Sequence, residues 1–228
     1  MRHLPTTAIL LFARTAPAEA AQKRWCGNAK RDRRVAQMLH RQTLRAAHRT
    51  GLPLCWVSEA DQTGSSFGQR LATAVARTFR SGYQRLLIIG NDCPQLTTEK
   101  LRRAAALLEQ NDTVLGPAKD GGVYLLGLSR AAWSAIDLTD FAWQTDRLCA
   151  EWRTKIPNLY CLQRLRDVDV LQDILRLPTS GTMANFVHRL MATVGDAAPR
   201  HRHLTWKHTG ARRFRSLRAP PAAAVLRA

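Results

Sequence analysis

Acidic side chains follow three apolar segments of this chain, close to the point where each segment ends. Asp92 comes after Leu86–Ile89, and Asp120 and the pair Asp167 and Asp169 follow two later apolar segments. If all these segments are strands of one open sheet, their ends meet at a single crevice. Carboxylate oxygens are the ligands that hard divalent cations prefer. The pattern therefore indicates a site for Mg²⁺ or Mn²⁺ beside a bound diphosphate.

Cationic side chains follow the first apolar segment, residues 6–13. Arg14, Lys23 and Arg24 lie in a stretch without regular patterning, so we predict a loop over 14–24. Arginine and lysine at a strand end are well suited to clamping the phosphates of a nucleotide. An ordinary solvated loop is the alternative interpretation of the same residues.

The segment that must position Asp92 is Leu86–Pro94. Four consecutive aliphatic residues predict a strand buried on both faces, as in a parallel sheet, and Gly90 and Pro94 end it abruptly. Asp92 is then delivered at the carboxyl end of a central strand. The alternative is an Asx turn or a cap for the next helix.

Apolar runs alternate with stretches of helical periodicity along most of the chain. This rhythm predicts an α/β fold in which a mostly parallel central sheet is flanked by helices on both faces. We expect strands over 6–13, 52–58, 86–89, 113–116, 123–128 and 158–162. We expect helices over 31–50, 69–81, 97–110, 131–136, 145–155 and 171–177.

Residues 117–122 form a second polar loop between two of the predicted strands. Asp120 is followed by Gly121 and Gly122, which would let the backbone approach a ligand closely. An Asp-Gly hairpin turn is the alternative interpretation.

The net charge of the 228 residues is +18, which favours anionic partners such as nucleotides or nucleic acid. Five cysteines without a CxxC pair suggest a reducing compartment, so we expect a cytoplasmic protein. No apolar run is long enough to cross a bilayer. Residues 1–5 are expected to lead into the first strand and not to form a signal peptide.

Three regions are expected along the chain. Residues 1–178 form the α/β domain, 179–194 add one helix, and 195–228 form a basic low-complexity tail. The tail lacks apolar periodicity, and we expect it to be disordered and to bind anions non-specifically.

Five short segments, in this order, together resemble one bacterial family. It is DUF2064, a family of glycosyltransferase-like proteins associated with radical-SAM and selenium-related proteins. The segments are FAR at 12–14, GNDCPQL at 90–96, VLGPAKDGGVYLLGL at 114–128, WQT at 143–145 and DVDVLQDI at 167–174. The resemblance covers about residues 6–177, and it implies the GT-A, Rossmann-like fold of nucleotide-diphospho-sugar transferases.

The resemblance also implies roles for individual residues. Asp92 matches the single acid that takes the place of the DxD metal motif, and Asp169 matches a later acid that helps to hold the metal. Asp120 matches the acid of the substrate loop, where it would orient or deprotonate the acceptor. Gly121, Gly122 and Tyr124 belong to the same loop.

The function implied is a metal-dependent, glycosyltransferase-like transfer from a nucleotide sugar to an acceptor that the sequence does not identify. A nucleotidyltransferase is one alternative. Another is a degenerate family member that only binds anions, because the PGxxKTRL segment usual after the first strand is replaced by residues 16–25. Only Lys23 and Arg24 stand in for its basic residues.

Overall fold

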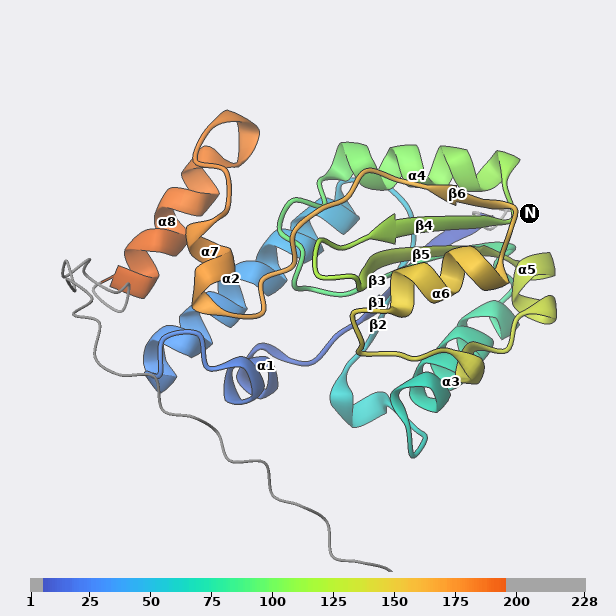
Figure 1. Ribbon diagram of the computed structural model, residues 1–228, viewed down its shortest axis with the longest axis horizontal. Coiled ribbons are helices and arrows are strands. Elements are labelled where there is room, and N and C mark those ends of the chain that lie inside the picture. The colour runs from blue at the N-terminus through green and yellow to red at the C-terminus, as the bar shows by residue number, and fades with distance from the viewer. Residues whose placement is uncertain (1–5, 196–228) are drawn as a thin grey trace, which may run out of the picture. The chain divides into compact units, whose positions relative to one another are not determined.

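The computed structural model describes residues 6–195, and its centre is a six-stranded sheet (Figure 1). The strand order is β2-β1-β3-β5-β4-β6, and β5 alone runs antiparallel to its neighbours. The strands are β1 Thr7–Phe12, β2 Leu54–Val57, β3 Arg85–Ile89, β4 Thr113–Pro117, β5 Val123–Ser129 and β6 Leu159–Cys161. The predicted α/β fold with a mostly parallel sheet is confirmed.

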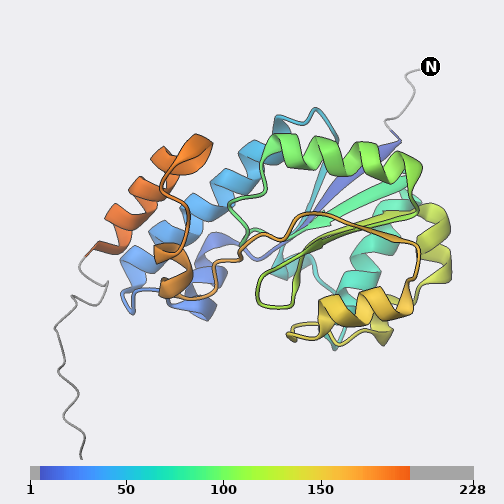
Figure 2. The ribbon, with the colours of Figure 1, turned by 45° about the horizontal axis from the view of Figure 1, so that its top comes forward.

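Helices cover both faces of this sheet (Figure 2). One face packs against α3, α5 and α6, and the other packs against α4 and the end of α2. The helices are α1 Ala16–Lys23, α2 Ala29–His48, α3 Phe67–Arg80, α4 Thr98–Gln110, α5 Arg130–Ala135, α6 Leu148–Lys155, α7 Leu171–Leu175 and α8 Ala184–Val194, with single 3-10 turns at Glu59–Asp61, Leu138–Asp140 and Gly181–Met183.

The side chains of β1 alternate between the two cores, as the period of a strand requires. Leu10 and Phe12 join the core under α3, whereas Ile9 and Leu11 join the core under α4. Every residue of β1 is buried, which explains its unbroken apolar sequence.

A third apolar cluster is formed mainly by α1, α2, α7 and α8. Trp25, Val35 and Ala36 pack there with Phe186 and Leu190 of α8. The helix expected over 179–194 therefore shares a core with α1 and α2, the elements that follow β1.

The loop predicted over 14–24 is wrong for most of its length, because residues 16–23 form α1. Thr15 has the extended backbone of an N-cap, and a proline stands in the first turn, where helices tolerate it. An ion pair between Glu19 and Lys23, four residues apart, supports the helix. Its only two buried residues are Glu19 and Ala20, so the helix shows no apolar stripe in the sequence.

Residues 118–122 form the turn of a β4–β5 hairpin, as the hairpin interpretation of these residues predicts. The Ala118 amide donates to the Gly122 carbonyl at 2.9 Å. Gly121 adopts φ +96°, and a Cβ at this position would overlap the backbone carbonyl of Asp146. The Gly121 carbonyl in turn accepts from the Cys149 amide at 2.9 Å. Gly121, the first of the two glycines, therefore lets the hairpin pack against the segment before α6.

Two further predictions concern the basic tail and membrane-spanning helices. The basic tail expected over 195–228 lies outside the described residues, apart from Gly195. Within residues 6–195, no helix combines the length and the apolar character that crossing a bilayer would need.

We expect Gly121→Ala to destabilise the fold by about 2–4 kcal/mol, because it adds backbone strain and a steric overlap. Gly51→Ala is the matched control, since Gly51 has φ +82° and open space around the added Cβ. It should cost only about 1–2 kcal/mol. Urea unfolding of both variants measures the difference, and equal losses would show that the hairpin does not depend on this close approach.

Candidate active site

A cavity of about 740 Å³ opens at the edge of the sheet where the parallel strands end. The loops after β1, β3, β4 and β6 all contribute to its wall. Most of the residues predicted for the site are brought together there. They are Arg14, Lys23, Asp92, Asp120, Gly122, Tyr124 and Asp169.

Backbone hydrogen bonds hold the segment around Asp169 against the loop that carries Asp92. The Val168 amide donates to the Asp92 carbonyl at 2.8 Å. The Val168 carbonyl accepts from the indole Nε1 of Trp25 at 3.2 Å. Because Trp25 is buried in the third cluster, the packing of α1, α2 and α8 helps to set where Asp169 lies.

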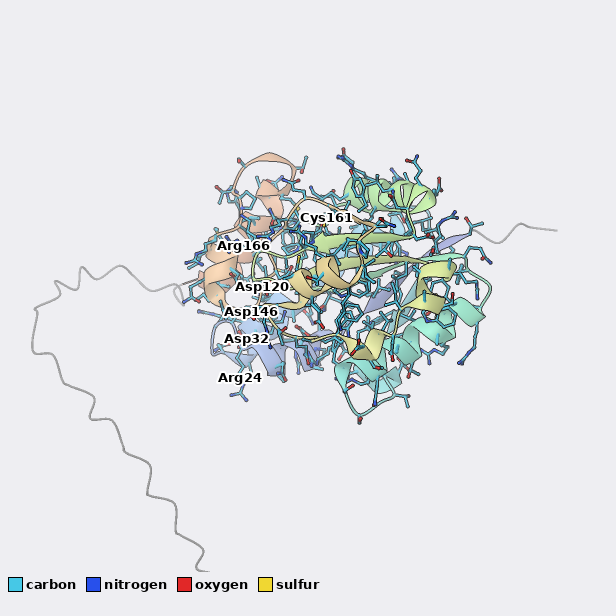
Figure 3. All side chains as sticks on the ribbon, turned by 45° about the vertical axis from the view of Figure 1, so that its right-hand side comes forward. Arg24, Asp32, Asp120, Asp146, Cys161 and Arg166 are labelled. Atoms are coloured by element: carbon cyan, nitrogen blue, oxygen red, sulfur yellow. The ribbon has the colours of Figure 1, made fainter. Side chains whose placement is uncertain are left out.

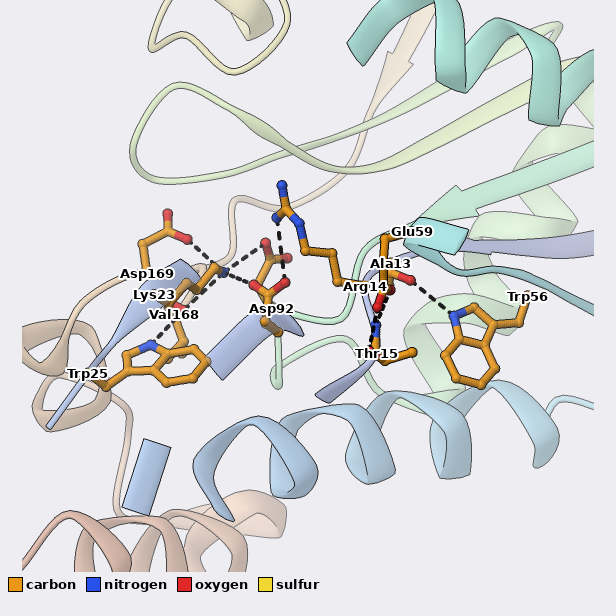
Figure 4. A network of polar contacts seen from close by, with 11 residues as sticks. Ala13, Arg14, Thr15, Lys23, Trp25, Trp56, Glu59, Asp92, Val168 and Asp169 are labelled. Carbon is orange, nitrogen blue, oxygen red and sulfur yellow. Dashed lines mark hydrogen bonds and ion pairs between the residues drawn. The ribbon is translucent and has the colours of Figure 1, made fainter. Parts of the chain in front are cut away.

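The ammonium group of Lys23 occupies the space between the carboxylates (Figure 4). Its Nζ lies 2.8 Å from Asp169 Oδ1, 3.1 Å from Glu19 Oε1 and 3.3 Å from Asp92 Oδ2. It also donates to the Val168 carbonyl at 3.3 Å. The side chain is only 12% exposed, so a cation that sequence reasoning placed in a loop is a buried centre of the site.

The charge of Lys23 is strongly favoured in this environment. Burial by itself lowers the pKa of the ammonium, but the charges of Asp92, Glu19 and Asp169 outweigh it. The pKa therefore lies well above its ordinary value. Lys23 therefore carries a positive charge at neutral pH.

Asp167 lies in the same cavity and is partly buried. Burial and the neighbouring charges of Asp92, Asp120 and Asp169 raise its pKa to about 9, against the opposing effect of Lys23. Its Oδ1 is buried without a hydrogen-bond partner among the described residues. The sequence pattern names Asp167 together with Asp169, but the family resemblance assigns the metal-binding role to Asp169 alone.

The acidic side chains that line the cavity are the candidate ligands of the predicted Mg²⁺ or Mn²⁺. Within residues 6–195, no group of three or more histidine, cysteine or acidic side chains is arranged to hold a metal ion alone. Mg²⁺, however, is usually bound by one or two carboxylates together with substrate phosphates. Asp92 and Asp169, with the unpartnered Oδ1 of Asp167 nearby, fit that kind of site.

Donors for an anion lie beside the acids. Arg14 Nη1 is 3.7 Å from Glu19 Oε2, so Glu19 contacts both Arg14 and Lys23. Glu19 is buried, and nothing in the sequence pattern indicated that it belongs to the site. Asn91 also lines the cavity, and its buried Nδ2 has no partner among the described residues. An unsatisfied buried donor is a suitable contact for a phosphate oxygen.

Asp120 and Tyr124, the two polar residues of the predicted substrate loop, both form hydrogen bonds within the protein. Asp120 Oδ1 accepts from the Gly122 amide at 2.9 Å and so shapes the turn. The Tyr124 hydroxyl donates to the Gln163 carbonyl at 2.9 Å, and burial raises its pKa. Asp120 remains exposed at the cavity wall, where it can reach a ligand (Figure 3).

Arg24 and Gly121, two of the predicted site residues, are not part of the cavity wall. Arg24 closes α1 in a left-handed conformation, and its exposed side chain folds back to the Ala21 carbonyl at 3.3 Å (Figure 3). Gly121 packs against Asp146, as described above.

Part of the cavity wall is aromatic, which the sequence patterns did not indicate. The rings of Phe12 and Phe67 lie 5.5 Å apart, edge to face, and Phe67 lies 5.5 Å from Trp143. Arg70 and Gln144 line the cavity as well. Trp143 belongs to the WQT segment quoted above, and the cavity wall combines charged side chains with rings against which an apolar or planar group can pack.

The arrangement of strands and helices matches a known fold. The fold is that of a candidate nucleotide-diphospho-sugar transferase from Desulfovibrio desulfuricans G20, with a TM-score of 0.67. The two sequences are 20% identical, and the match covers 82% of this chain and 96% of that one.

More distant likenesses include Rv0371c from Mycobacterium tuberculosis H37Rv, with a TM-score of 0.47 at 18% identity, covering 77% of this chain and 100% of that one. A cytidylyltransferase from Leptospira borgpetersenii serovar Hardjo-bovis has a TM-score of 0.43 at 10% identity, covering 84% and 97%.

The family is the one described as "Uncharacterized protein conserved in bacteria", DUF2064, which matches residues 19–145. This span is more than half of the 228 residues, and the chain belongs to that family. No curated protein matches the sequence.

We expect Asp167→Asn to stabilise the protein more at pH 8 than at pH 5. The unfolded carboxyl loses its proton near pH 4, whereas the folded one keeps it up to about pH 9. Between these values the unfolded state binds fewer protons, so stability falls as pH rises, by up to about 1.4 kcal/mol per pH unit. Asparagine does not titrate and removes this loss.

Urea unfolding of both proteins at several pH values, in metal-free buffer, tests the expectation. A constant difference in unfolding free energy between pH 5 and pH 8 would contradict the buried, charge-crowded position of Asp167.

Proposed function

We propose that this protein is a metal-dependent, glycosyltransferase-like enzyme that uses a nucleotide-activated sugar. The observation that supports this most is the convergence of Asp92, Asp167 and Asp169 with Lys23 and Arg14 in one cavity at the carboxyl edge of the sheet. Carboxylates that could hold a cation lie there beside cationic side chains that could bind phosphates. The volume of the cavity suits a ligand of nucleotide size.

The charged end of the cavity would take the diphosphate. Arg14 and Lys23 would bind its oxygens through charge-assisted hydrogen bonds, and the Asn91 amide would donate a further hydrogen bond. Asp92 and Asp169 would hold Mg²⁺ or Mn²⁺, which supplies positive charge beside the departing diphosphate.

In the transfer itself, the bond between the sugar's anomeric carbon and the diphosphate oxygen breaks, and the nucleoside diphosphate leaves. The acceptor oxygen forms the new bond to that carbon and gives up its proton. Asp120, exposed at the cavity wall, would orient the acceptor or take this proton. The acceptor itself stays unidentified.

Nucleotidyl transfer is the alternative that the same acids and cations would serve. It is the weaker proposal because only three residues, 13–15, separate the end of β1 at Phe12 from the start of α1 at Ala16, and none of them is glycine. A glycine-rich loop that cradles a triphosphate is therefore missing at this position.

We expect Asp92→Asn to weaken the Mn²⁺-dependent part of nucleotide binding by at least about tenfold, because a carboxylate–metal contact is lost. Calorimetry with nucleoside diphosphates and nucleotide sugars, each with and without Mn²⁺, measures this part as a ratio of affinities. Glu109→Gln is the control, since it removes one negative charge from an exposed site on α4 outside the cavity.

Wild-type protein that binds none of these nucleotides with Mn²⁺ would contradict the proposal. So would an Asp92→Asn variant with the same metal dependence as wild type. Release of pyrophosphate from a nucleoside triphosphate and a sugar phosphate, without release of nucleoside diphosphate from nucleotide sugars, would favour nucleotidyl transfer instead.

A further inference from the structure

The position of Lys23 conflicts with both roles that the charged end of the cavity is proposed to perform. An ammonium group has three N–H donors, and Lys23 faces four acceptors within 3.3 Å. All of its hydrogen bonds are therefore used inside the protein. Lys23 cannot bind a phosphate in this arrangement without releasing some of these partners.

The same contacts concern the proposed metal ligands. Nζ lies 3.3 Å from Asp92 Oδ2 and 2.8 Å from Asp169 Oδ1, which places a positive charge between the two carboxylates. A divalent ion bound by both would lie close to this charge, and like charges at such distances repel strongly in a partly buried site. A metal ion and the ammonium group therefore compete for one position.

Glu19 offers the ammonium group a partner that does not need to change. Glu19 and Lys23 are four residues apart on α1, and Glu19 Oε1 lies 3.1 Å from Nζ. Glu19 is also next to Arg14, the other cation of the cavity. Lys23 can thus leave Asp92 and Asp169 and turn towards a diphosphate beside Arg14 while its pair with Glu19 persists.

We propose that Lys23 holds the cation position in the ligand-free protein, so that a divalent metal ion enters only together with a diphosphate. The diphosphate draws the ammonium group away from Asp92 and Asp169, and the metal ion takes its place between them. Metal and nucleotide then bind as a unit, and neither binds tightly alone. This inference rests on the proposed function, because it assumes that a metal and a diphosphate share the cavity.

Binding of Mn²⁺ alone, followed by the electron paramagnetic resonance signal of the free ion, tests the inference without any activity assay. We expect Lys23→Met to bind Mn²⁺ at least about tenfold more tightly than wild type, because a competing cation is removed. Adding the best-bound nucleoside diphosphate should raise the Mn²⁺ affinity by a larger factor in wild type than in Lys23→Met.

Lys30→Met is the matched control, since Lys30 is exposed on α2, does not line the cavity, and loses the same charge. Its Mn²⁺ affinity should equal that of wild type. Circular dichroism checks that the variants fold. If Lys23→Met does not fold, Lys23→Gln replaces it, because its amide can still donate to the Val168 carbonyl.

Equal Mn²⁺ affinities of wild type and the folded Lys23 variant would overturn the inference. If wild type still binds Mn²⁺ together with a nucleotide in that case, the proposed function is untouched. If wild type binds no nucleotide with Mn²⁺ at all, the proposed function fails first and the inference fails with it.

Discussion

The contact between Lys23 and its carboxylates is the interaction on which the candidate site depends. Glu19, Asp92 and Asp169 meet at one ammonium group, and Asp167 lies beside them. Without a cation, these acids would repel each other in a partly buried space. The site is therefore built around a positive charge, which the protein supplies itself when no ligand is bound.

The helices outside the sheet make that contact possible. Lys23 ends α1, and Trp25, two residues later, is buried between α2 and α8 while its indole donates to Val168. One packed cluster thus positions both the cation and the segment that carries Asp169. Although α8 lies beyond the residues that the family match covers, it helps to fix the geometry of the charged end.

The sheet could be predicted from the sequence because its central strands are buried on both faces and read as apolar runs, as in Leu86–Ile89. The meeting of Asp92, Asp120 and Asp169 followed from the rule that parallel strand ends share one edge. The helix α1 was missed because it buries a glutamate and an alanine and has no apolar stripe. The contacts of individual side chains could not be predicted from the sequence. The ion pair of Lys23 with Glu19, and the position of the Arg24 side chain outside the cavity, depend on tertiary packing.

The central claim is that one cation position is shared by Lys23 and a divalent metal ion. A crystal structure of the protein with Mn²⁺ and a nucleoside diphosphate tests it most directly, because the anomalous signal of manganese locates the ion. The account predicts Mn²⁺ between Asp92 and Asp169, with the Lys23 ammonium on a phosphate oxygen. Mn²⁺ bound elsewhere, or a Lys23 that keeps its contacts with Asp92 and Asp169 while the nucleotide is bound, would contradict it.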